Sequence, residues 1–124
     1  MVRHSETISA SVVIDDAAQR LTAKFHPLKI ILFGSHARGE ATPDSDLDFL
    51  IVMPDSTDRR RAAIEMHRLL GDLPIPKDIL VTTPREIAKR GDLVGTALRP
   101  ALHEGRVLYE RLELIMNGEQ WFAE

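Results

Sequence analysis

Acidic residues stand at the start of two apolar segments of the chain. Asp46 and Asp48 form an Asp-x-Asp pair where the segment 47–53 begins, and Asp78 opens the apolar part of the segment 77–82. Alternate residues of a β-strand point to one face, so Asp46 and Asp48 are expected to project together. If the two segments are neighbouring strands, Asp78 joins them and three carboxylates meet at one point.

Such a cluster of like charges calls for a cation, because each carboxylate raises the pKa of the next. Mg2+ prefers oxygen ligands and keeps phosphate oxygens in its shell. Two such ions about 3.5–4 Å apart can clamp the attacking and leaving oxygens of an in-line displacement. Ordinary turn chemistry would account for Asp44 and Asp46, but it does not explain Asp48, which lies inside a strand where Asp is disfavoured.

The pair Gly34-Ser35 follows another apolar segment and precedes Asp46 by ten intervening residues. Glycine lets a phosphate approach the backbone, while serine offers a hydroxyl and an N–H group. By itself the pair fits an ordinary turn equally well. Combined with Asp-x-Asp at this spacing, it predicts a triphosphate site beside the metal site.

These residues require a sheet to position them. Buried strands are predicted at 28–33, 47–53 and 77–82, with an edge strand at 105–109 and a loop or short helical turn at 34–45. Helices are predicted at 8–24, at 58–70 with Asp58 as its N-cap, from Pro84 to Arg90 with Thr83 and Glu86 as a capping box, at 93–104, and at 110–124. The order predicts an α+β fold, a small mixed β-sheet with helices mainly on one face.

Length and composition bound the kind of protein. The 124 residues fit one domain, 1–124. The chain has no cysteine and no apolar run of the roughly 20 residues that a membrane helix needs, so a cytoplasmic protein without membrane contact is expected. Its net charge of −3 argues against general nucleic-acid binding, and the run 59–61 of three arginines is interpreted as a solvated helix face.

The segment Gly34-Ser35-x10-Asp46-x-Asp48, with Ala37-Arg38-Gly39 inside it and Ser45 before the first aspartate, resembles the signature of the minimal nucleotidyltransferases. These belong to the superfamily of DNA polymerase β-type nucleotidyltransferases. The similarity extends from about residue 25 to 109, including the entry Ile31 to Ser35 and the ending 104–109, Glu-Gly-Arg-Val-Leu-Tyr. The resemblance implies the polymerase β-type nucleotidyltransferase fold.

The resemblance also implies roles for six residues. Gly34 and Ser35 would hold the triphosphate of ATP, while Asp46 and Asp48 would bind two Mg2+ ions. Asp78 would bind the catalytic ion and help to deprotonate the attacking hydroxyl. Arg38 would either contact the phosphates or pair with a carboxylate to brace the loop.

A partner is implied by the resemblance alone. Many stand-alone members are antitoxins that act on a HEPN-domain ribonuclease toxin, and some attach AMP to a tyrosine of that toxin. The expected function is therefore protein adenylylation within a hetero-oligomer with the toxin. Two alternatives stay open: an antitoxin that masks its toxin without catalysis, and a nucleotidyltransferase that acts on a small molecule or an RNA end. The intact carboxylates favour an enzyme, and the acidic charge disfavours RNA.

Several other residues carry no clear signal. The five histidines lack a metal-ligand spacing, although His36 follows Ser35 and is within reach of a phosphate. Trp121 and Phe122 are interpreted either as packing residues or as an anchor for a partner. Met53, Met66 and Met116 are expected in the core.

Overall fold

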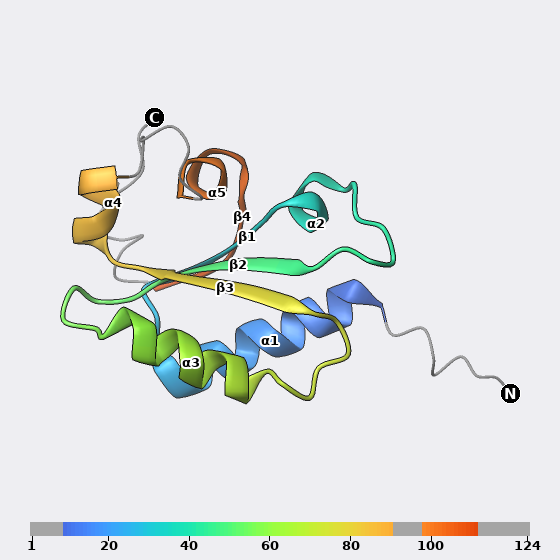
Figure 1. The fold of residues 1–124 in the computed structure, drawn as a ribbon, viewed down its shortest axis with the longest axis horizontal. Coiled ribbons are helices and arrows are strands. Elements are labelled where there is room, and N and C mark those ends of the chain that lie inside the picture. The colour runs from blue at the N-terminus through green and yellow to red at the C-terminus, as the bar shows by residue number, and fades with distance from the viewer. Residues whose placement is uncertain (1–8, 91–97, 112–124) are drawn as a thin grey trace, which may run out of the picture.

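A computed structural model describes residues 9–90 and 98–111 (Figure 1). A four-stranded sheet in the order β3-β2-β1-β4 organises these residues. Its strands are β1 Lys29–Phe33, β2 Leu47–Val52, β3 Lys77–Thr82 and β4 Arg106–Glu110. β1 pairs antiparallel with β2 and β4, whereas β2 and β3 are parallel. The predicted mixed sheet is confirmed, and β4 lies at its edge as expected.

The two longest helices cover one face of the sheet. These are α1 Ala10–Phe25 and α3 Arg59–Leu69, and both lie below the strands in Figure 1. The short helices α2 Ser35–Arg38 and α5 Leu98–Glu104 lie on the other side, and α4 Pro84–Arg90 follows β3. The α+β class is confirmed, with the main helical layer on one face and a smaller cover on the other.

Alternation along the strands divides the core between these faces. Toward α1 and α3 the strands present Leu32, Leu47, Phe49 and Ile51, all 0% exposed, and Met66 of α3 packs there as predicted. Burial of each such side chain contributes roughly 1.5–3 kcal/mol. The smaller cluster on the opposite face contains Ile31, Leu50 and Ala101. Residues of β2 with even numbers, Asp48 included, therefore face away from the main core.

Local sequence signals fix the helix ends. The Asp58 side chain accepts from Arg61 N at 3.2 Å, and Thr83 Oγ1 accepts from Glu86 N at 3.2 Å. The Glu86 carboxylate pairs with Arg90 at 2.9 Å. α1 ends at Phe25, and its C-cap His26 is a non-glycine residue in the left-handed conformation with φ 50°. Pro27, which was expected to stop the helix, follows directly.

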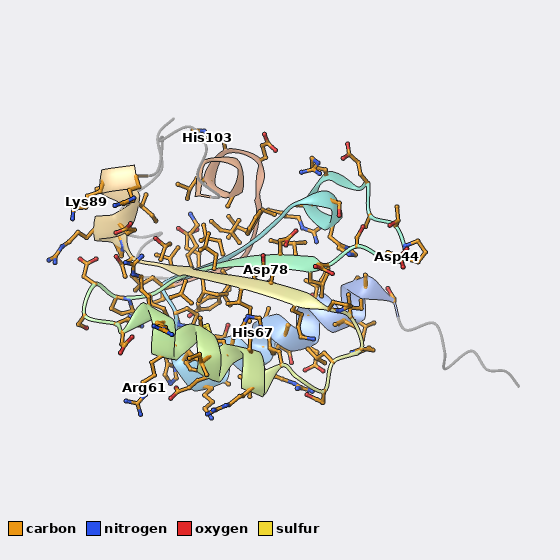
Figure 2. The ribbon with its side chains drawn as sticks, in the orientation of Figure 1. Asp44, Arg61, His67, Asp78, Lys89 and His103 are labelled. Carbon is orange, nitrogen blue, oxygen red and sulfur yellow. The ribbon has the colours of Figure 1, made fainter. Side chains whose placement is uncertain are left out.

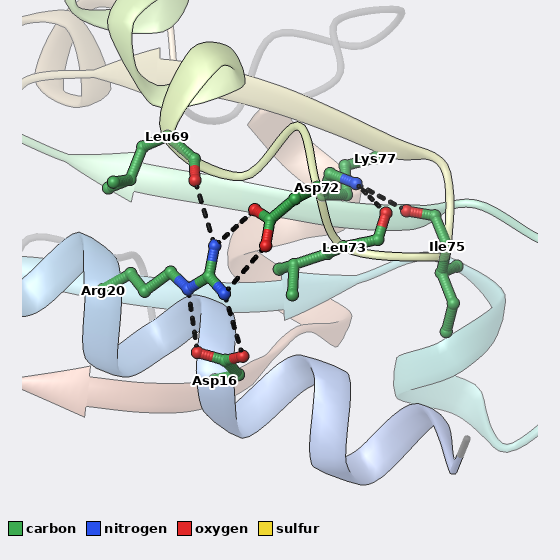
Figure 3. A network of polar contacts seen from close by, with 7 residues as sticks. All are labelled: Asp16, Arg20, Leu69, Asp72, Leu73, Ile75 and Lys77. Atoms are coloured by element: carbon green, nitrogen blue, oxygen red, sulfur yellow. Dashed lines mark hydrogen bonds and ion pairs between the residues drawn. The ribbon is translucent and has the colours of Figure 1, made fainter. Parts of the chain in front are cut away.

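A polar network ties α1 to the loop that leads into β3 (Figure 3). Arg20 donates to Asp16 Oδ1 at 2.9 Å, to Asp72 Oδ1 at 2.6 Å and to the Leu69 carbonyl at 3.2 Å. Lys77, the first residue of β3, donates through Nζ to two carbonyls of this loop, those of Leu73 at 3.2 Å and Ile75 at 2.7 Å. This network fixes the chain immediately before Asp78.

Some predictions fall outside the described residues. These are the helix at 110–124 with Met116, Trp121 and Phe122, the first residues of the helix at 93–104, and Ile8 of the first helix. Over the described parts of the chain, no helix has the length and apolar character that a membrane span requires.

Candidate active site

Two of the predicted acidic residues are direct neighbours across the sheet. The parallel register of β2 and β3 pairs Asp48 with Asp78. Both therefore project from the face that lies opposite α1 and α3, and Asp78 is exposed at this surface (Figure 2). Phe33, the partner of Asp48 on β1, flanks the pair on its other side. The sequence-based expectation that the two strands adjoin is confirmed.

Asp46 lies one residue before β2, and backbone contacts on both sides hold it. Ser45 N donates to Thr42 O at 3.0 Å, and Thr42 N donates to Ser45 Oγ at 2.9 Å, which closes a turn around Pro43 and Asp44. After Asp46, Leu47 N donates to Pro76 O at 2.9 Å and joins the start of β2 to the start of β3. Asp46 is exposed at the mouth of the site.

Gly34 lies against the Asp48 carboxylate. Its φ of 76° and ψ of −160° belong to a region that essentially only glycine adopts. A Cβ atom at this position would overlap Asp48 Oδ2 and lie 3.1 Å from Asp48 Cγ. The predicted reason for this glycine was the approach of a phosphate. The structure adds a second reason, the approach of a carboxylate.

The electrostatics of Asp48 reflect this crowding. Its pKa is raised, first by burial and then by the negative charges of Asp78 and Asp46. Arg38 and the nearby His36 act in the opposite direction and lower the pKa of Asp48. Among the described residues, no three acidic or histidine side chains already have the mutual spacing of a metal site. Asp46 and Asp78 are exposed, so rotation of their side chains can bring oxygens toward an ion that relieves the repulsion at Asp48.

α2 forms the second wall of the site. It begins at Ser35 with Gly34 as its N-cap. The N–H groups of Ala37 and Arg38 donate to the Gly34 carbonyl at 3.1 Å and 3.2 Å, whereas those of Ser35 and His36 have no acceptor within the helix. Arg38 Nε donates to Glu40 Oε1 at 2.9 Å, which pairs this arginine with a carboxylate of the loop. The His36 Nε2 atom lies 3.4 Å from the Ser45 carbonyl oxygen.

Sequence reasoning missed the supporting contacts. Arg20 and Asp72 are 52 residues apart, and their ion pair leaves no local signal in the sequence. Lys77 stood in the predicted strand without an assigned role, although its neighbour Asp78 was singled out. The sequence indicates only a phosphate contact or a surface position for His36, and it has no local signal for the contact to Ser45.

The structure is a small α+β domain with a pair of carboxylates near the starts of two parallel strands, and comparison with known proteins gives its family. The model described as "Nucleotidyltransferase domain" matches residues 14–109. The chain therefore belongs to the nucleotidyltransferase domain family.

Relatives agree with this assignment. A Methanocaldococcus jannaschii protein named "Putative protein adenylyltransferase MJ1305" is 38% identical over 63 residues, which are 49% of this chain and 41% of that protein. The match thus spans less than half of the relative.

Two solved structures share the fold. The crystal structure of "a putative nucleotidyltransferase from Sulfolobus solfataricus" has a TM-score of 0.53 and 18% identity, covering 81% of this chain and 79% of that one. A mutant of the toxin–antitoxin complex MntA-HpeT has a TM-score of 0.50 and 17% identity, covering 80% and 75%.

Proposed function

We propose that this protein moves AMP from ATP onto a hydroxyl group of a partner protein. Two Mg2+ ions would bind at the carboxylates near the starts of β2 and β3. One observation carries the proposal: Asp48 and Asp78 are register partners on parallel strands, with Asp46 close enough to raise the pKa of Asp48. Gly34 lies against the same carboxylate, so the turn that would receive phosphates adjoins the acidic group.

Each residue of the site would have a role that follows from its position. Asp46 and Asp48 would hold both ions, and Asp78 would hold the ion nearest the attacking hydroxyl. When bound, the ions would neutralise phosphate charge and lower the pKa of that hydroxyl. Gly34, Ser35 and Arg38 would orient the triphosphate. Ser35 would use its hydroxyl and backbone N–H, and Arg38 would exchange Glu40 for a phosphate oxygen.

Transfer of AMP would replace one bond between phosphorus and oxygen by another. The acceptor oxygen forms a bond to the α-phosphorus, and the bond between that phosphorus and the pyrophosphate oxygen breaks. The proton of the acceptor hydroxyl passes to the Asp78 carboxylate, and pyrophosphate leaves with the bonding electron pair. Asp78 suits the role of proton acceptor because it is exposed at the surface where an acceptor would approach.

We propose that the acceptor is a toxin of the HEPN-domain class. Three findings support this. The relative from Methanocaldococcus jannaschii carries the name of a protein adenylyltransferase, the fold recurs in the toxin–antitoxin complex MntA-HpeT, and the motif resembles that of minimal nucleotidyltransferases. Asp78, the outer member of the carboxylate pair, is also exposed, as an acceptor of protein size requires.

Label transfer tests the proposal. The chain is co-expressed with the product of the adjoining gene, and the purified mixture is incubated with Mg2+ and ATP labelled at the α-phosphate. We expect label and an added AMP mass on the partner, and their loss with the double change Asp46→Asn and Asp48→Asn. Asp44→Asn is the matched control because Asp44 is an exposed acid of the same loop, within the turn (Figure 2). Transfer that survives the double change refutes the metal assignment.

The same experiment separates catalysis from masking. A partner that is inhibited but carries no AMP supports a purely steric antitoxin. Label on a small molecule or an RNA end instead of on protein identifies another acceptor. Binding is tested independently: ligand at 100 times its Kd stabilises a protein by about 2.7 kcal/mol, so Mg2+ with ATP should raise the Tm of the wild type and not of the double variant.

A further inference from the structure

His36 joins the two halves of the site. It is the second residue of α2, directly after Ser35, and its Nε2 atom lies 3.4 Å from the carbonyl oxygen of Ser45. Ser45 immediately precedes Asp46 in the chain. The side chain of His36 therefore connects α2 with Ser45, the residue before Asp46.

The Ser45 peptide is restrained from the other direction as well. Its N–H donates to Thr42 O at 3.0 Å, and its hydroxyl accepts from Thr42 N at 2.9 Å. These bonds close the tip of the loop on itself and do not attach it to α2. In the described structure, the contact from His36 is the hydrogen bond that links the Ser45 carbonyl to the helix.

Asp46 depends on such neighbours because its own side chain is exposed. Its backbone is fixed after the residue by the bond from Leu47 N to Pro76 O, 2.9 Å. On the N-terminal side of Asp46, the backbone is held through the contacts of Ser45 with Thr42 and His36. Without the contact to His36, this side of Asp46 would be held by the turn from Thr42 to Ser45 alone, which has no bond to α2 through Ser45.

We propose that His36 is a positioning residue for Asp46. A carbonyl oxygen only accepts, so Nε2 carries the hydrogen and donates it to Ser45 O. The bond holds the loop against α2 and sets the distance between the carboxylate of Asp46 and the turn at Gly34. The inference rests on the proposed function, since it assigns Asp46 a task that needs accurate placement.

Two replacements separate the hydrogen bond from the volume of the ring. His36→Phe keeps a ring of similar size without a donor, while His36→Gln supplies an amide N–H of similar reach. A misplacement of about 1 Å costs on the order of 100-fold in rate. We expect His36→Phe to lower kcat about tenfold and to raise the Mg2+ concentration for half-maximal rate several-fold, with KM for ATP within about twofold. His36→Gln should recover most of the loss.

His67→Phe is the matched control. His67 is an exposed histidine of α3, on the other side of the sheet from α2 (Figure 2). It should leave kcat and the Mg2+ dependence unchanged. Equal activity of His36→Phe and wild type, or equal losses in His36→Phe and His36→Gln with an unchanged Mg2+ dependence, would overturn the proposal.

Two measurements need no transfer activity. In amide hydrogen exchange, Ser45 N and Leu47 N should exchange faster in His36→Phe than in wild type, and at wild-type rates in His36→Gln and His67→Phe. Mn2+ titration followed by electron paramagnetic resonance should show weaker binding in His36→Phe alone. If the wild type transfers no AMP, the proposed function fails, and these two readouts still decide the role of His36. Unchanged exchange and Mn2+ affinity in His36→Phe refute it.

Discussion

Replacing Gly34 by alanine should disturb both the stability of the fold and the place of Asp48. The φ and ψ angles of Gly34, 76° and −160°, strain any residue with a Cβ atom, at a cost on the order of 1–3 kcal/mol. The new Cβ would also overlap Asp48 Oδ2. The carboxylate must then turn away from the position beside Asp78, which should abolish a Mg2+-dependent rise in Tm.

Gly39→Ala is a control that keeps the strain and omits the overlap. Gly39 has φ 74° and ψ 21°, and an added Cβ would meet no atom within 4 Å. A left-handed alanine costs about 1–2 kcal/mol, and both replacements gain roughly 0.4–1 kcal/mol because the unfolded chain loses freedom. Gly39→Ala should therefore lower the free energy of unfolding and keep the response to Mg2+.

A double-mutant cycle isolates the contact. Asp48→Ala removes Cγ and Oδ2, the two Asp48 atoms that come nearest to the added Cβ. In that background Gly34→Ala should cost less than in wild type, with a coupling energy of about 0.5–3 kcal/mol, whereas Gly39→Ala should be additive with Asp48→Ala to within about 0.5 kcal/mol. Urea denaturation of the six proteins measures both cycles. A coupling of zero for Gly34 and Asp48, with Mg2+ binding intact in Gly34→Ala, would refute the packing described for this site.

Three further predictions concern charge and burial. The pKa of Asp48 in the folded state is raised, chiefly by burial. The contribution of this carboxyl group to stability is therefore present below the unfolded pKa of about 3.9 and is lost as pH rises through the folded pKa. In the absence of metal, Asp48→Asn should raise the free energy of unfolding at pH 7 and change it little at pH 3. The pKa of Asp72 is lowered, chiefly by its hydrogen bond from Arg20, so that contribution is present above about pH 4 and is lost as pH falls through the folded pKa. In urea denaturation, the stability difference between wild type and Arg20→Met should be larger at pH 7 than at pH 2, and a pH-independent difference would contradict the ion-pair account. Thr82 is 1% exposed and its hydroxyl has no hydrogen-bond partner within the described structure; Thr82→Val should raise the free energy of unfolding by about 1 kcal/mol, since an unpaired buried hydroxyl is unfavourable, and a loss of that size would show that the hydroxyl is paired.

Local patterns were sufficient for the elements of the fold. Apolar segments bounded by glycine and proline predicted all four strands to within one or two residues, because strand length and burial leave a strong signal. The caps at Asp58 and Thr83 were predicted because side-chain oxygens satisfy the free N–H groups of a first turn. The end of α1 was predicted to within one residue, although the left-handed residue that follows it is His26, where glycine is usual.

The geometry of the candidate site depended on information that no local pattern holds. The chain sequence places Asp48 and Asp78 at the starts of two segments, but only the sheet order makes those segments adjacent. The Arg20–Asp72 pair and the His36–Ser45 contact depend equally on tertiary packing. What the sequence did contain was an anomaly, a carboxylate inside an apolar strand, and such local exceptions concentrate at functional positions.

The parallel pairing of β2 and β3 is what makes the acidic group. Each strand has a carboxylate as its second residue, and the starts of two paired strands meet at one end of the sheet only when the strands run parallel. An antiparallel pair of the same segments would place Asp48 and Asp78 at opposite ends. A parallel pair requires a long crossover, and here α3 supplies it from below the sheet, where Arg20 and Lys77 fasten its return to β3. The face that carries the carboxylates is thereby left clear of the two long helices. The crossover through α3 thus has two consequences for the proposed chemistry. It brings the starts of β2 and β3 together, and it places α3 on the face of the sheet away from the acceptor.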